Sequence, residues 1–186
     1  MKLKKLNALL GLLSILFMLL HILYSVFTYL SFYYNPLMTK LFAVPFLVIV
    51  CLHAVLGMLS VSLQQDGTRL DLYPKQNLRT ILQRVSAALI FPLLILHLYT
   101  FSFMQASAEE GQALFIFLLI FAEIIFFAAV LTHVATSLTK GFVTLGLLSS
   151  PKKQKILDLI IYILCGIIFV VSVYVIAKTQ AAMFLH

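Results

Sequence analysis

Four histidines are the residues of this sequence whose type and spacing indicate chemistry. Each lies in a different long apolar segment with almost no charged neighbours: His21, His53, His97 and His133. A titratable side chain within a hydrocarbon layer is costly, so four of them in one chain call for a shared partner. Neutral imidazole is a nitrogen ligand of iron, and two imidazoles from facing helices can be the axial ligands of one haem. We therefore expect the four histidines to bind haem.

The composition is typical of an integral membrane protein. Of the 186 residues, 63% are hydrophobic and 10% are charged, and the mean hydropathy is +1.11. A water-soluble globular domain has a much lower apolar fraction. We expect one membrane domain over residues 1–186, in a lipid bilayer, with no enzyme activity of its own, because no polar stretch is long enough to form a soluble core. The net charge of +7 is not taken as a sign of nucleic-acid binding, because its position along the chain indicates orientation instead.

Five apolar segments are each long enough to cross a membrane as a helix. Their expected ranges are 6–30, 41–63, 82–103, 113–138 and 156–177. The first run is too long for a secretory signal and lacks a small-residue cleavage site, so we expect it to be kept as a helix. The pattern predicts an all-α integral membrane protein whose first four helices form a haem-binding bundle, with the fifth helix outside it.

The lysines and arginines predict how the chain is oriented. Eleven of the thirteen lie before the first span, between the second span and Arg84 at the start of the third, or between the fourth and fifth. Lys40 and Lys178 are the two exceptions. Because cations are concentrated in cytoplasmic loops, the N-terminus is expected in the cytoplasm and the C-terminus outside.

Counting residues from the cytoplasmic end of each span, at about 1.5 Å per residue, estimates the depth of each histidine. His21 and His97 lie at about 22 Å, His53 at about 15 Å and His133 at about 8 Å. Two axial ligands of one iron must lie at similar height. The counts therefore predict an outer haem between His21 and His97, and an inner haem between His53 and His133.

Small residues lie near the histidines on the same helix faces. Gly57 follows His53 by four residues, and Ser137 follows His133 by four, which places each one turn from its histidine. Such residues leave room for a flat macrocycle. Membrane helices also use glycine and serine for ordinary helix packing, so this signal by itself leaves both interpretations open.

Three further residues are candidates for the surroundings of the cofactors. Ser86 precedes His97 by 11 residues and shares its face if the kink expected at Pro92 is mild. Arg84 opens the third span, where a guanidinium could hold the propionates of the inner haem or simply extend to the membrane surface. Glu123 lies well inside the fourth span, where a carboxylate could transfer protons, bind a quinone or bond to a neighbouring helix.

The whole chain resembles the five-helix cytochrome b that anchors succinate dehydrogenases and fumarate reductases carrying two haems b. One histidine in each of the first four spans is part of this resemblance. Three local patterns strengthen it: QRVS at 83–86 followed by His97, His53-Ala54 with Gly57, and His133 followed by Phe142 and TLGL at 144–147.

The resemblance implies a function that composition cannot show. It implies a flavoprotein and an iron–sulfur subunit bound on the cytoplasmic face, menaquinone as the lipid partner, and residence in the bacterial cytoplasmic membrane. It also implies axial pairing of the first helix with the third and of the second with the fourth, as the depth counts predict. Electrons would pass between the quinone and the iron–sulfur subunit through the two haems.

Two other interpretations stay open from the sequence. One is a dihaem cytochrome b of another kind, such as a cytochrome b561-like or hydrogenase-type anchor, against which the five-span order and the stretch from His133 to Gly146 count. The other is a haem-free transporter or assembly protein in which the histidines form a proton relay.

Overall fold

The computed structural model describes residues 2–64 and 74–185, and within them it contains five helices and no strand. Each helix is long and apolar enough to cross a membrane, as expected for a multi-pass membrane protein. Their bounds are α1 Lys2–Ser31, α2 Pro36–Gln64, α3 Pro74–Glu109, α4 Ala113–Thr144 and α5 Pro151–Phe184. Arg69, one of the cations used to predict orientation, lies outside the described residues.

The helices extend beyond the apolar segments that predict them. The largest difference is in α3, which begins at Pro74 rather than near residue 82 and ends at Glu109 rather than near 103. Apolar runs mark the part of a helix that lies in hydrocarbon, whereas backbone hydrogen bonding continues into the polar flanks. Arg79 and Lys140, which the sequence places in connections, therefore lie on α3 and α4.

Two helix ends are set by specific residues. At the start of α2, the Asn35 side-chain oxygen accepts hydrogen bonds from the backbone N–H groups of Leu37 and Met38, at 3.0 and 3.2 Å. At the end of α4, Gly146 adopts a φ of 79°, and the Leu147 N–H bonds back to the Phe142 carbonyl at 3.0 Å. This is a glycine-terminated Schellman cap. The TLGL stretch is therefore a helix stop in this chain.

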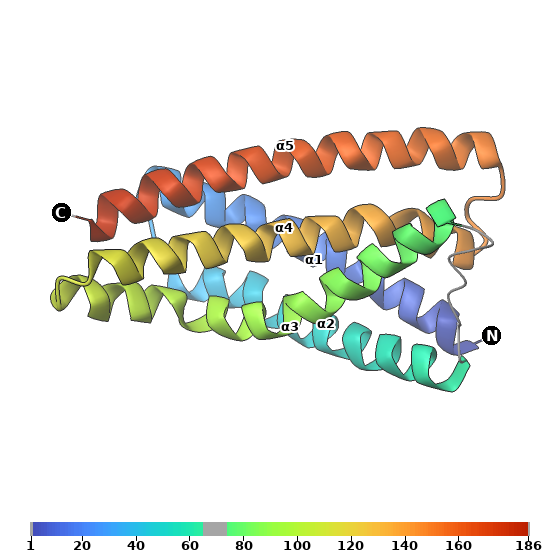
Figure 1. The fold of residues 1–186 in the computed structure, drawn as a ribbon, viewed down its shortest axis with the longest axis horizontal. Helices are drawn as coiled ribbons and strands as arrows, with labels where there is room; N and C mark the ends of the chain where they lie inside the picture. The colour runs from blue at the N-terminus through green and yellow to red at the C-terminus, as the bar shows by residue number, and fades with distance from the viewer. Residues whose placement is uncertain (1, 65–73, 186) are drawn as a thin grey trace.

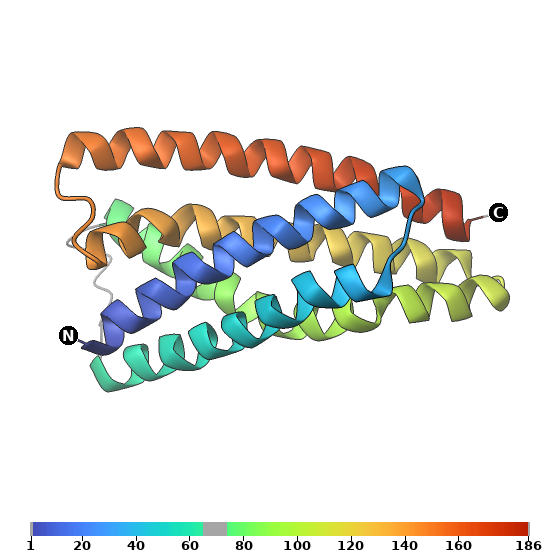
Figure 2. The same cartoon turned by 180° about the vertical axis from the view of Figure 1, so that it is seen from behind.

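The helices run alternately up and down, as Figure 1 and the reverse view in Figure 2 show. The N-terminus and the α4–α5 connection lie at one end, which we name the N-terminal end. The α3–α4 turn and the C-terminus lie at the opposite end. Lys2, Lys4 and Lys5 thus share an end with Lys152, Lys153 and Lys155, at the starts of α1 and α5.

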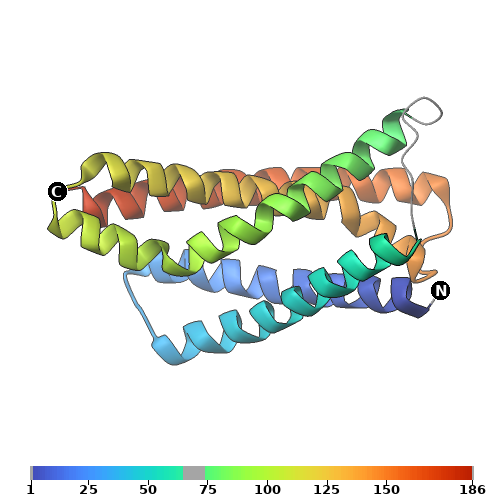
Figure 3. The ribbon, with the colours of Figure 1, turned by 60° about the horizontal axis from the view of Figure 1, so that its bottom comes forward.

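Helix packing divides the bundle into two pairs and an outlying helix. α1 packs along α2, α3 packs along α4, and α5 lies mainly against α4. Among the described residues the two pairs approach each other chiefly through α1 and α4. α3, which contains Pro92 within it, changes direction along its length (Figure 3). The diagonal partners α1 with α3, and α2 with α4, therefore make little or no close backbone contact.

The best-buried apolar cluster lies near the opposite end, between α3, α4 and α5. Its members are Met104, Ile116, Leu119, Ile120 and Ile176, each at most 8% exposed. The four histidines lie outside this cluster and are half-buried. Apolar packing thus holds α3, α4 and α5 together, with Leu96, the residue before His97, packed against the cluster.

The Asn35 cap gives a test of the α1–α2 connection. Asn35→Ala removes the acceptor of two backbone N–H groups and should lower the free energy of unfolding by about 1 kcal/mol. Asn35→Asp keeps an acceptor and should retain most of the stability. Thermal unfolding in detergent measures both, and an equal loss in the two variants would contradict the capping role.

Candidate functional site

The four histidines form two close pairs. His21 on α1 and His97 on α3 have ring centroids 6.5 Å apart, with an angle of 88° between the ring planes. His53 on α2 and His133 on α4 have centroids 6.3 Å apart, at 68°. These are the pairs predicted from the depth counts. Each pair joins diagonal helices whose backbones stay apart, so the imidazoles meet at the tips of their side chains.

The separation of the rings matches that of two imidazoles bound to one metal. A metal–nitrogen bond is about 2.0 Å long. Ring centroids 6.5 and 6.3 Å apart therefore leave room for one metal ion between the two imidazoles of each pair. The spacing of each pair therefore suits axial ligation of a single haem iron.

We name His53 and His133, which lie toward the N-terminal end, the inner pair, and His21 and His97 the outer pair. The inner pair is held by backbone carbonyls. The His53 Nδ1 lies 3.0 Å from the carbonyl oxygen of Asn7 on α1, and the His133 Nδ1 lies 3.0 Å from that of Gln83 on α3. A carbonyl oxygen only accepts hydrogen bonds, so each Nδ1 must carry the proton. Each Nε2 then keeps its lone pair, which is the form that binds a metal.

The outer pair has a different environment. The His97 Nδ1 lies 2.8 Å from Oε2 of Glu123 on α4, and the His97 ring stacks on Phe126, with centroids 4.9 Å apart. The His21 ring stacks on Phe46 at 6.0 Å. Its Nδ1 is buried and has no hydrogen-bond partner among the described residues. One outer imidazole is thus bonded to a carboxylate, and the other is held by packing.

The His53 ring packs closely against Gly11 of α1, where a larger residue would not fit. A β-carbon built on Gly11 would lie 2.9 Å from Cε1 and 3.3 Å from Nδ1 of His53, so a side chain there would displace the ring. Gly57, predicted to flank His53, instead faces the side chain of Asn7, whose amide oxygen would lie 3.8 Å from an added β-carbon. Gly57 therefore serves the contact between α1 and α2 that supplies the Asn7 carbonyl.

The other predicted residues gather around the inner pair. Ser86 is buried, and its hydroxyl donates to the Leu82 and Gln83 carbonyls at 2.6 and 3.1 Å. Ser86 therefore lies at the Gln83 carbonyl, to which the His133 Nδ1 also donates, and not beside His97 as predicted. The Ser137 hydroxyl donates to the His133 carbonyl at 2.6 Å. Arg84 lies next to Gln83 on α3.

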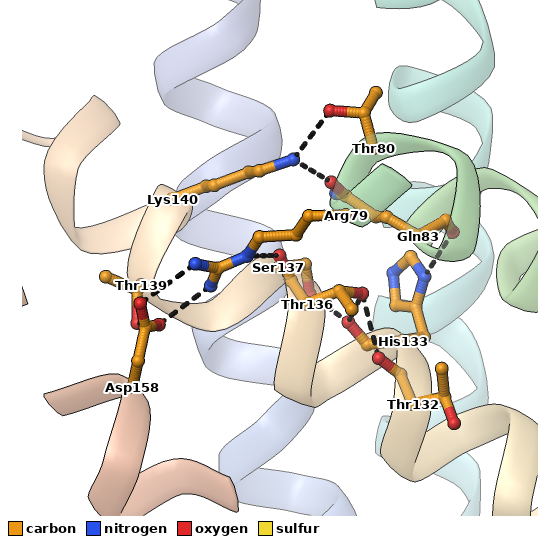
Figure 4. A network of polar contacts seen from close by, with 10 residues as sticks. All are labelled: Arg79, Thr80, Gln83, Thr132, His133, Thr136, Ser137, Thr139, Lys140 and Asp158. Carbon is orange, nitrogen blue, oxygen red and sulfur yellow. Dashed lines mark hydrogen bonds and ion pairs between the residues drawn. The ribbon is translucent and has the colours of Figure 1, made fainter. Parts of the chain in front are cut away.

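A polar network connects this inner site to α5 (Figure 4). The Arg79 guanidinium makes two hydrogen bonds to the Asp158 carboxylate, at 2.9 and 2.8 Å, and its Nε donates to the Thr136 carbonyl at 2.9 Å. The Thr139 hydroxyl donates to the same carboxylate at 2.6 Å. The ion pair is bidentate, and both side chains are about one-fifth exposed, at 23% and 20%.

Lys140 extends the network toward the inner ligands. Its ammonium donates to the Thr80 hydroxyl at 3.1 Å and to the Gln83 side-chain oxygen at 2.9 Å. Gln83 therefore bonds to α4 twice, through its amide oxygen to Lys140 and through its backbone carbonyl to His133. The network fixes the relative positions of α3 and α4 beside the inner pair.

Sequence reasoning does not find three of these contributors. The Arg79–Asp158 pair joins residues 79 positions apart, and nothing in their local sequence marks them as partners. The Asn7 and Gln83 carbonyls are backbone atoms, so residue type does not single them out. Gly11 can be recognised as a contact site for the His53 ring only when the packing of α1 on α2 is known.

The described residues offer two pairs of imidazoles as candidate metal ligands. Among residues 2–64 and 74–185, no group of three or more histidine, cysteine or acidic side chains could hold a metal ion. A haem would take two imidazoles from the protein, and each pair could provide them.

No family model, curated protein or solved structure matches this chain.

Gly11 and Gly166 form a matched pair of substitution sites. Gly11→Ala places a methyl group against the His53 ring and should destabilise the protein by about 1–3 kcal/mol through overpacking. At Gly166 on α5, an added β-carbon meets nothing within 4 Å, so Gly166→Ala should be neutral or slightly stabilising. Thermal unfolding distinguishes them, and similar values for both would contradict the close approach at Gly11.

The Arg79–Asp158 pair is testable by a double-mutant cycle. Arg79→Met and Asp158→Leu each leave the other charge without its partner, whereas the double variant removes both charges. The coupling free energy should therefore be about 1 kcal/mol or more. Thermal unfolding of the four proteins measures it, and a coupling below about 0.5 kcal/mol would show that the pair contributes little to docking α5.

Proposed function

We propose that this chain is the dihaem membrane anchor of a succinate dehydrogenase or fumarate reductase complex. In this proposal it carries electrons between a membrane quinone, menaquinone by resemblance, and a cytoplasmic iron–sulfur subunit. The observation that carries the proposal is the meeting of the four intramembrane histidines in two diagonal pairs, at 6.5 and 6.3 Å. A haem bound in each pair supplies a one-electron redox centre whose potential the surrounding protein adjusts.

The chain's own residues perform two tasks in this function, which are to hold the imidazoles as ligands and to exclude water. His53 and His133 present Nε2 lone pairs because the Asn7 and Gln83 carbonyls hold their Nδ1 protons. His97 bonds through its Nδ1 to a carboxylate instead, that of Glu123. The long apolar helices exclude water from both sites, which limits side reactions of a reduced centre with solvent.

The N-terminal end suits the docking of the catalytic subunits. It carries the six lysines at the starts of α1 and α5, together with Arg79, Arg84 and Lys140. By the positive-inside rule this end faces the cytoplasm. The inner pair lies toward this end, close to the docked iron–sulfur subunit, while the outer pair lies on the side where we place the quinone.

The purified complex tests this proposal directly. Haem extraction should give two haems b per anchor chain, and a flavoprotein and an iron–sulfur subunit should copurify with it. Reduction by a menaquinol analogue should produce a b-type difference spectrum. A protein without haem would favour the transporter or assembly interpretation, whereas two haems without dicarboxylate-converting partners would favour another kind of dihaem cytochrome.

A further inference from the structure

Glu123 is an acidic residue buried in the middle of a membrane-spanning helix. It is 4% exposed, and both carboxylate oxygens are occupied. Oε2 lies 2.8 Å from the His97 Nδ1, and Oε1 accepts from the Thr100 hydroxyl at 2.8 Å. Thr100 is itself 3% exposed, and the Leu96 carbonyl, 2.9 Å away, is a second acceptor within reach of its one hydroxyl hydrogen. The carboxylate is therefore fixed at both oxygens by residues of α3.

This contact distinguishes His97 from the other three histidines. His53 and His133 bond to neutral backbone carbonyls, and the His21 Nδ1 has no partner among the described residues. A carboxylate accepts a more strongly polarised hydrogen bond than a carbonyl does. It therefore gives the imidazole more anionic character and makes its Nε2 a stronger electron donor to a bound metal.

We propose that Glu123 is a positioning residue that orients His97 and lowers the reduction potential of the outer haem. This inference rests on the proposed function, because it takes His97 to be an axial ligand. A negative charge behind the ligand stabilises the oxidised iron, which carries one more positive charge than the reduced iron. The carboxylate acts through His97 and does not itself touch the iron.

The geometry favours this role over direct contact with a quinone. A quinone ligand needs a polar atom facing an opening into the membrane, whereas the Glu123 oxygens point at His97 and Thr100 and are buried. Thr100 lies three residues after His97, on the adjacent part of the same helix face, so α3 presents both donors together. The pair of donors holds the carboxylate at a fixed place behind the imidazole.

The test is a potentiometric titration of both haems in three variants of the intact complex. Glu123→Gln keeps the shape and an acceptor oxygen but removes the charge. At a fixed potential it should raise the ratio of reduced to oxidised outer haem at least tenfold, which is 59 mV for a one-electron couple. Thr100→Val leaves His97 as the carboxylate's remaining donor, so it should lower that ratio by about threefold or more.

Glu109→Gln is the matched control, because it removes an exposed carboxylate near the end of α3. It should change the ratio of reduced to oxidised haem by no more than about twofold at either site. The ratio for the inner haem should also stay within twofold of wild type in all three variants, since the ligands of that haem bond to Asn7 and Gln83. A readout of potentials separates this role from a purely structural one, which would change haem content or stability while leaving the potential of the remaining outer haem unaltered.

The outcomes separate the two proposals. Two haems per chain with an outer potential that is unchanged in Glu123→Gln would overturn the role of Glu123 and leave the proposed function standing. An unchanged outer potential in Thr100→Val would overturn it too, should Glu123→Gln fail to assemble. Wild-type complex without haem would overturn both. Opposite shifts in the two variants, confined to the outer haem, are the expected result.

Discussion

The structure depends on the need of an imidazole N–H within a membrane for a hydrogen-bond acceptor. In hydrocarbon an unsatisfied N–H is expensive, and for three of the four paired histidines a neighbouring helix offers the acceptor. For His53 and His133 the acceptors are backbone carbonyls of neighbouring helices, and for His97 the acceptor is a carboxylate. Each of these bonds fixes the proton on Nδ1 and holds the ring beside the facing histidine. Tautomer, ring position and helix packing are thereby set together.

The same constraint explains how the helices are arranged. Gly11 lets α1 approach α2 closely enough for the Asn7 carbonyl to reach His53. On the other side of the bundle, Gln83 ties α3 to α4 through His133 and Lys140. The tight pairs α1–α2 and α3–α4 are thus the pairs that supply hydrogen bonds to the inner ligands. The diagonal helices remain apart, and their histidines face each other across the separation.

Much of this arrangement follows from the sequence, because membrane helices have a strong hydropathy signal. The five helices are confirmed, and counting residues along them predicts which histidines meet. The counting works because a helix rises by a constant amount per residue. Two histidines at similar depth are therefore a similar number of residues from the same end of their helices. Haem ligation, the orientation of the termini and the partner subunits stay predictions.

Other features depend on the three-dimensional packing. Glu123 stands out in the sequence as an intramembrane acid, yet its partner on α3 follows only from the packing of α3 on α4. Ser86 is expected beside His97 because the two lie 11 residues apart, on one face of the helix. Its hydroxyl instead bonds to the Gln83 carbonyl, which also accepts from the His133 Nδ1. Asp158 and Arg79 lie at span ends, where charged residues usually serve the membrane surface, and their pairing has no local signature.

The pairing of the histidines is the central claim, and haem content in double variants tests it most directly. Replacing both members of one pair, as in His21→Ala with His97→Ala, should leave one haem b per chain. Replacing one member of each pair, as in His21→Ala with His53→Ala, should leave none, although the same number of histidines is lost. One haem retained in the second variant would contradict the pairing.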